Sequence, residues 1–260
     1  MKKFFKYLLL FLVSIILFLV VGSTVWWHLK SDTEKSDFLV DAHHYEKALE
    51  YNPANSDAWM ERSVSYNKAG DFSKGFEYLD KAVEIDPIKH LGYRGWIRLR
   101  KMRDYDKALL DFDRLDNLTP NVTDAPWGED IDFLRGECYF GKKDYPKAIE
   151  MFNRNIKTQK EDWVDIHTFV YLGLCEYELG NYEKSITEFE RALRQSVNIP
   201  ESHFGIAKAY QKLGDLEKSK AHILKAESNI ASKREDYYNE YLNEIYLSEI
   251  VEFKRALENK

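Results

Sequence analysis

Histidine and cysteine are the side chains here best suited to metal or redox chemistry, but their spacing favours neither. Seven histidines are scattered along 260 residues, and the only pair, His43 and His44, is adjacent. Adjacent helical residues point about 100° apart, so this pair cannot chelate one ion well. The sequence has no glycine-rich phosphate loop, HExxH or GxSxG motif. We therefore expect no metal, no cofactor and no catalysis.

The two cysteines, Cys138 and Cys175, occupy equivalent places in two similar segments, each two residues after a glycine. Packed helices lie about 8–10 Å apart, whereas a disulfide needs Cα atoms closer than about 7 Å. We predict two buried free thiols.

Composition and charge indicate a folded chain that does not bind nucleic acid. Apolar residues make up 44% of the chain, charged residues 32%, and the net charge is −6. The sequence carries no basic stripe that could follow a phosphate backbone. With six prolines and twelve glycines, long disordered linkers are not expected.

An uncharged apolar segment, Tyr7 to Trp27, predicts a single transmembrane helix. At 1.5 Å per residue it spans about 31 Å, close to the roughly 30 Å hydrocarbon core. Lys2, Lys3 and Lys6 precede it, and the charges that follow it nearly cancel. This bias places the N-terminus in the cytoplasm and the remainder outside the cell membrane, after a linker at residues 28–35.

The alternative is a cleaved secretory signal peptide, with residues 20–23 ("VVGS") as a poor cleavage site. The apolar run is longer than the roughly 7–15 residues usual for a signal, which favours an uncleaved anchor. A cleaved chain would be periplasmic or secreted, so both alternatives export the remainder.

One phrase recurs six times, for example as "GNYEKSITEFERALRQSV" at residues 180–197. Aligned on their third residue, the copies are 34, 33, 40, 37 and 34 residues apart. A period near 34 is typical of stacked helical hairpins. The aligned residues are Phe38, Phe72, Tyr105, Tyr145, Tyr182 and Leu216.

The residues around each aligned position predict where one helix ends and the next begins. An Asp or Asn stands directly before it, a type that caps helix N-termini. In three copies a glycine precedes this cap, where a left-handed residue can end the first helix. That first helix carries one small residue nine positions upstream: Ser63, Gly136, Gly173 or Ala207.

These features resemble the tetratricopeptide repeat family, and residues 171–193 ("YLGLCEYELGNYEKSITEFERAL") are nearly a consensus line. The resemblance covers residues 36–233. It implies an all-α, right-handed superhelical solenoid of helical hairpins that binds other proteins. We expect a half repeat at 36–53, without a first helix, and then five repeats at about 54–88, 89–121, 129–160, 166–199 and 200–233.

Three departures from the family pattern predict local irregularities. Trp96 stands at the small position of the second repeat, with Gly95 one residue out of phase, so we expect a slip there. Insertions fall near residues 122–128 and 160–165. Asn155 replaces a small apolar residue, which predicts poorer packing of the third hairpin.

Residues 234–260 match no repeat and predict one long helix with a broad apolar face. A helical array must cover its last hairpin, so this helix is expected to be a cap. The alternative is a helix that docks a partner or a second copy.

By resemblance, the first helices line the inner face of the array. The expected partner groove consists of Met60, Val64, Tyr93, Ile97, Phe133, Phe140, Val170, Leu174, Tyr177 and Phe204. Such a row should not face water uncovered, so either a partner segment or the chain's own C-terminal helix fills it. The Lys/Asn clamp by which some relatives hold chaperone tails is absent.

The resulting hypothesis is a membrane-anchored, non-catalytic scaffold for protein–protein interaction in a bacterial cell envelope. The alternative is a periplasmic or secreted subunit that assembles through its C-terminal helix. The sequence does not determine the partner or whether the chain forms homo-oligomers.

Overall fold

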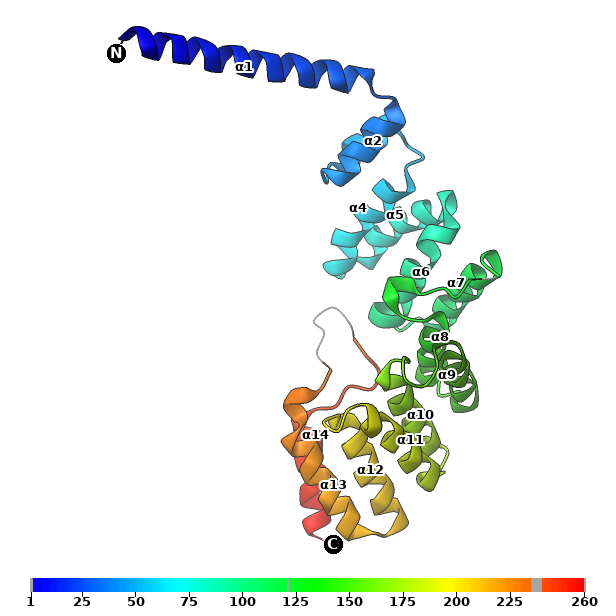
Figure 1. The fold of residues 1–260 in the computed structure, drawn as a ribbon. Helices are drawn as coiled ribbons and strands as arrows, with labels where there is room; N and C mark the ends of the chain where they lie inside the picture. The colour runs from blue at the N-terminus through cyan, green and yellow to red at the C-terminus, as the bar shows by residue number, and fades with distance from the viewer. Residues whose placement is uncertain (1, 121, 235–239, 260) are drawn as a thin grey trace. The chain divides into compact units, whose positions relative to one another are not determined.

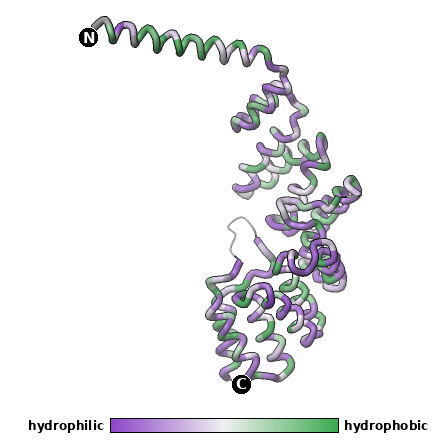
Figure 2. Tube along the Cα trace, viewed as in Figure 1, coloured by the Kyte–Doolittle hydropathy of each residue, from purple (hydrophilic) through white to green (hydrophobic). Residues whose placement is uncertain are grey.

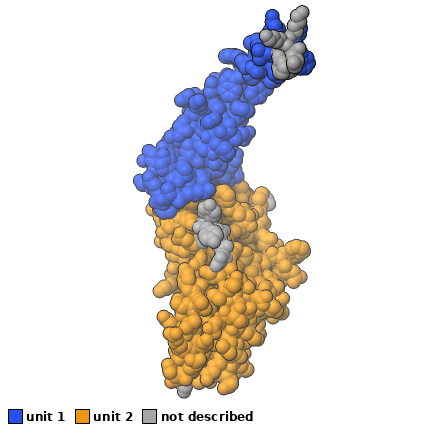
Figure 3. Space-filling view, turned by 90° about the vertical axis from the view of Figure 1, so that its left-hand side faces the viewer, with its two compact units in different colours: residues 1–90 blue, residues 91–260 orange. Residues whose placement is uncertain are grey.

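The computed structural model describes residues 2–120, 122–234 and 240–259, and the regular secondary structure in these ranges is entirely helical (Figure 1). The chain forms two compact units, residues 1–90 and 91–260 (Figure 3). The helices are α1 (Lys2–Leu29), α2 (Asp32–Asp41), α3 (Tyr45–Tyr51), α4 (Ser56–Lys68), α5 (Phe72–Ile85), α6 (Pro87–Ile97), η1 (Arg98–Met102), α7 (Tyr105–Leu118), η2 (Pro126–Gly128), α8 (Ile131–Gly141), α9 (Tyr145–Gln159), α10 (Ile166–Glu178), α11 (Tyr182–Gln195), α12 (Pro200–Leu213), α13 (Leu216–Ser228), η3 (Ile230–Ser232) and α14 (Leu247–Glu258).

Consecutive helices pair as hairpins, and a residue in the left-handed conformation joins the two helices of each pair. In four hairpins the next residue is Asp, as predicted, and its carboxylate accepts a hydrogen bond of 3.0–3.4 Å from the N–H three residues on. This bond satisfies one of the free amides at the start of the second helix. The left-handed residues are His43, Gly70, Arg103, Lys143, Gly180 and Gly214.

The expected half repeat at residues 36–53 is wrong, because this stretch contains parts of two helices. Phe38 lies inside α2, and α3 begins at Tyr45 directly after the left-handed residue His43 and His44. Tyr45 therefore takes the place assigned to Phe38, 27 residues before Phe72 (72 − 45). The first repeat is a short but complete hairpin, closed by a hydrogen bond of 2.9 Å from Ser36 Oγ to the carbonyl oxygen of Ala48.

Aromatic rings from the second helices pack directly on glycines of the first helices. A Cβ atom added to Gly136 would lie 2.5 Å from the ring of Phe152, and one on Gly173 would lie 2.7 Å from the ring of Phe189. Real Cβ atoms do not come this close, so these contacts require glycine. The spacing of small and large residues in the sequence thus sets how closely the two helices approach.

The expected slip in the second repeat is present as a π-helical turn, η1, that follows α6. A π turn accommodates one extra residue in a helix. Gly95 therefore faces Phe112, at 2.6 Å from a hypothetical Cβ, although it lies ten rather than nine residues before Tyr105. The glycine-to-ring contact is kept and the additional residue is absorbed by η1.

The third hairpin accepts its polar residue without an unpaired group. Asn155 is buried, and its side-chain oxygen accepts a hydrogen bond of 3.0 Å from Thr168 Oγ1. Cys138 and Cys175 are fully buried free thiols, as predicted, and burial raises the pKa of both.

The C-terminal region is not one long helix, which corrects that prediction. Residues 240–246 are non-helical, and only α14 is helical after them; Tyr238, part of the expected apolar face, lies outside the described residues. The expected cap is present, because Ile250 and Leu257 of α14 are buried against α12 and α13. The apolar residues of this region are buried as expected, but along an irregular path.

Helix α1 is long and apolar enough to cross a membrane (Figure 2). A signal sequence near the N-terminus has the same length and composition. The stretch Leu9–Leu29 of α1 has a mean hydropathy of 2.6, and none of its residues is fully buried. The end of α1 packs on the first hairpin, where the ring of Trp27 lies 5.7 Å from Phe38 and 5.8 Å from Tyr51. The aromatic pair at the end of the apolar run therefore joins α1 to α2 and α3.

Candidate functional site

The ten predicted groove residues differ in how far they are covered. Tyr93, Ile97, Phe133, Val170 and Phe204 are buried. Partly exposed side chains remain at the other five positions: Met60, Val64, Phe140, Leu174 and Tyr177.

Three covering contacts account for most of the buried positions. The ring of Tyr93 lies 5.4 Å from Trp127, which belongs to η2 in the first insertion. Phe133 packs edge-on against Tyr171 at 5.9 Å, and Phe204 packs against Phe253 of α14 at 5.7 Å. In residues 91–260 the chain's own aromatic residues therefore cover part of the expected groove.

A fully buried ion pair lies between η1 and α8. Arg100 and Glu137 are both 0% exposed, and the Arg100 guanidinium donates to the Glu137 carboxylate and, at 2.7 Å, to Glu129. Burial alone would lower the pKa of Arg100, but the two carboxylates raise it above its ordinary value. The guanidinium therefore stays charged and draws together three segments of the chain.

Tyr171 and His167 of α10 extend this polar cluster to the C-terminal region. Tyr171 donates its hydroxyl proton to Glu137 Oε1 at 2.7 Å and accepts the N–H of Leu242 at 3.2 Å. The Asn243 side-chain nitrogen lies 2.7 Å from His167 Nδ1. Together these residues bind residues 240–246 through both its backbone and its side chains.

The sequence did not identify this cluster as a site. Arg100 and Glu137 fall on positions that the resemblance places on the inner face, where most neighbours are apolar. The opposite charges of Arg100 and Glu137, at such positions in successive repeats, were the only sign in the sequence that they could pair. No pattern in the sequence indicated the pairing with residues 240–246, because it joins segments about 140 residues apart (241 − 100 = 141).

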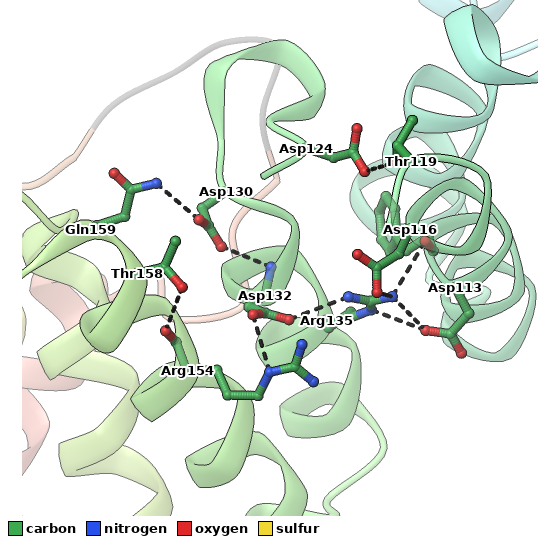
Figure 4. Close-up of polar contacts among 11 residues, drawn as sticks. Asp113, Asp116, Thr119, Asp124, Asp130, Asp132, Arg135, Arg154, Thr158 and Gln159 are labelled. Carbon is green, nitrogen blue, oxygen red and sulfur yellow. Dashed lines mark hydrogen bonds and ion pairs between the residues drawn. The ribbon is translucent and has the colours of Figure 1, made fainter. Parts of the chain in front are cut away.

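A second polar network fastens α7, α8 and α9 to one another (Figure 4). Arg135 of α8, with a 6% exposed side chain, pairs with Asp113 at 2.9 Å, Asp116 at 3.1 Å and Asp132 at 3.3 Å. Asp132 in turn pairs with Arg154 of α9 at 3.3 Å. Each charge in the network has an opposite charge beside it, so its role is to hold the hairpins together.

Within the described ranges, no three His, Cys, Asp or Glu side chains gather in a way that could hold a metal ion. His203 and His222 approach with their Nδ1 atoms 3.2 Å apart, but His203 Nε2 bonds to the Val197 carbonyl oxygen. The partly exposed side chains of the expected groove remain the candidate site.

These hairpins and their inner face define an α-solenoid of the tetratricopeptide type. Residues 42–87 and 200–229 match models described as tetratricopeptide repeat, and residues 173–214 match one described as TPR repeat. The matched segments are therefore tetratricopeptide repeats, and the structure extends the same hairpin architecture to the segments between them.

Curated relatives share this repeat character at low identity. The chain is 26% identical to BBSome complex member BBS4 of Bos taurus, over 74% of this chain and 34% of that protein. It is 23% identical to TPR repeat-containing protein MJ1428 of Methanocaldococcus jannaschii, over 80% of this chain and 38% of that protein. The chain thus spans little more than a third of either relative.

Solved structures share the fold. The pilus biogenesis factor PilW is 17% identical with a TM-score of 0.59, covering 77% of this chain and 92% of that one. YrrB, described as a TPR protein with an unusual peptide-binding site, is 16% identical with a TM-score of 0.55, covering 71% and 91%.

Proposed function

We propose that this chain is a non-catalytic scaffold that binds another protein through the inner face of its tetratricopeptide repeats. The supporting observation is that each unit, taken by itself, keeps some of the expected groove side chains partly exposed. Met60 and Val64 in the first unit, and Phe140, Leu174 and Tyr177 in the second, remain partly exposed. Partly exposed apolar side chains at neighbouring positions within one unit are in keeping with a surface that binds another protein.

The scaffold is anchored in the cytoplasmic membrane by α1, with its repeats on the outer side. The unburied apolar stretch Leu9–Leu29 supports this, as do the lysines before it. The match in fold to a pilus biogenesis factor is in keeping with a place in the cell envelope.

Cysteine labelling in intact cells tests this topology. Both native thiols are fully buried, whereas the side chain of Trp163 is 83% exposed. With a membrane-impermeant maleimide, we expect Trp163→Cys to be labelled from outside and the matched Lys6→Cys only after lysis. Labelling in the opposite order would refute the proposed orientation.

The mass of the purified product separates an anchored chain from a cleaved one. An uncleaved chain stays in the membrane pellet after alkaline extraction, with the full mass of 30.8 kDa. A soluble product that begins near Ser23 would instead support the periplasmic alternative. The packing of α14 on α12 and α13 does not favour assembly through that helix, because Ile250, Phe253 and Leu257 already pack against them.

A further inference from the structure

Residues 240–246 lie on the second unit in the manner of a bound peptide. This stretch is part of the orange segment that follows α13 in Figure 1. It is non-helical, and its alternate side chains are buried: Tyr241, Asn243 and Ile245 are only 7%, 6% and 9% exposed. The segment turns at residues 242–243, and burial of every second side chain means that one side of it packs on the unit as a bound peptide would.

The aromatic residue of this segment is held by two guanidinium groups. The Arg100 guanidinium carbon lies 4.3 Å from the Tyr241 ring centre, and that of Arg234 lies 4.1 Å from it. Cations over an aromatic face are attracted by its electron density, most strongly when water is excluded. Arg100 is kept charged by Glu137 and Glu129, so an aromatic ring at this place is attracted more strongly than an aliphatic side chain would be.

The backbone and the polar side chains of the segment are also recognised. Tyr171 accepts the N–H of Leu242, and His167 pairs with the side chain of Asn243. Lys101 forms a 3.5 Å ion pair with Glu240. The surface thus contacts, in chain order, an acidic side chain, an aromatic side chain, one backbone N–H and one side-chain amide.

The internal segment leaves three buried polar atoms of this surface without a hydrogen-bond partner among the described residues: Arg100 Nε, Arg234 Nη1 and Glu137 Oε2. Glu137 Oε1 accepts bonds from Arg100 and Tyr171, but Oε2 is buried without a hydrogen-bond partner among the described residues. A buried acceptor without a donor costs free energy. A ligand with one more N–H or O–H donor at this point would satisfy it.

We propose that residues 240–246 are a displaceable internal ligand, and that the partner presents a non-helical segment of the same chemistry to this surface. The partner segment carries an acidic residue, then an aromatic residue, an aliphatic residue and Asn or Gln. This inference rests on the proposed scaffold function and specifies the ligand of one part of the inner face. Its consequence is regulation, because the partner must compete with the chain's own segment.

A competition experiment on the full chain in detergent micelles tests the proposal. The probe is a fluorescent peptide of sequence EYLNEIY, identical to residues 240–246. In the variant Tyr241→Ala with Asn243→Ala the internal ligand is weakened, so we expect the peptide to bind about tenfold more tightly than to the wild type. A control peptide with alanine at the Tyr and Asn positions should not bind. Adding His167→Leu to the variant should reverse the gain.

Equal affinity of wild type and variant, or equal binding of the two peptides, would overturn the proposal. Circular dichroism melts verify that the variant is folded. If it is not, Tyr241→Leu keeps an apolar side chain in the buried position and should still increase peptide affinity. If the chain forms dimers that the peptide dissociates, the occupant is a second copy, and the choice of a foreign partner is overturned.

Failure of this proposal can be told apart from failure of the scaffold function. Val64 lies in the first unit, outside the surface covered by the internal ligand. If a partner protein binds at Val64 while the peptide experiment is negative, only the internal-ligand proposal is overturned. If no partner protein binds at Val64, the scaffold function itself is contradicted.

Discussion

The free energy of unfolding should decrease in mild acid, because the folded chain keeps His167 buried and neutral. The side chain is 5% exposed, and its Nδ1 is paired with the Asn243 side chain. Burial first, and then the positive charge of Arg234, lower its pKa from 6.5 to about 4, against the opposing effect of Asp165. The folded chain therefore holds His167 neutral where the unfolded chain already binds a proton.

The sign and magnitude follow from this difference. Between pH 6.5 and pH 4 the unfolded state binds more protons, so the free energy of unfolding decreases as the pH falls. Each unit between the two pKa values is worth about 1.4 kcal/mol, so His167 alone removes about 3 kcal/mol over this range.

Urea unfolding of the wild type and of His167→Gln, followed by circular dichroism from pH 7.5 to pH 4, measures this contribution. Glutamine does not titrate and keeps an acceptor for Asn243. We expect the wild type to lose about 3 kcal/mol relative to the variant as the pH falls. A difference between the two proteins that does not change with pH would refute the assignment of a buried, neutral His167.

Three further predictions concern packing. Gly173→Ala should lower the free energy of unfolding by about 1–3 kcal/mol, because its Cβ would lie 2.7 Å from the Phe189 ring. The control Gly22→Ala, whose Cβ would meet nothing within 4 Å, should leave the free energy of unfolding unchanged. Thermal melts of both variants measure the difference. Ile250→Asp should cost about 3 kcal/mol or more by burying a charge under the cap, whereas Ser248→Asp on the exposed side should be nearly neutral in urea titrations. The two buried thiols should react with a thiol reagent only in step with unfolding; rapid reaction of the folded chain would show that the hairpins open locally.

The hairpins could be predicted because their signals are local. The left-handed glycines, the Asp caps and the glycine-to-ring spacing all act within one hairpin, and the structure retains them. The π turn could also be anticipated, from a glycine one residue out of phase. Phe38 was misassigned because two aromatic residues seven positions apart, Phe38 and Tyr45, both fit a helical face.

The C-terminal path could not be predicted, because distant contacts decide it. Leu242, Tyr246 and Ile250 fit a helical period, and propensity alone favours one helix. Pairing of Tyr241 with Arg100, and of Asn243 with His167, holds residues 240–246 in a non-helical form instead. Tertiary contacts outweigh the modest differences in intrinsic helix propensity.

Recognition of another protein by the inner face is tested most directly by site-specific photocrosslinking in cells. A photoreactive amino acid at Val64 of α4 replaces a partly exposed residue of the expected groove, and one at Lys81 is an exposed control on α5. The scaffold function predicts a discrete crosslinked protein from Val64 and none from Lys81. Equal crosslinking from both positions, or none from Val64, would contradict it.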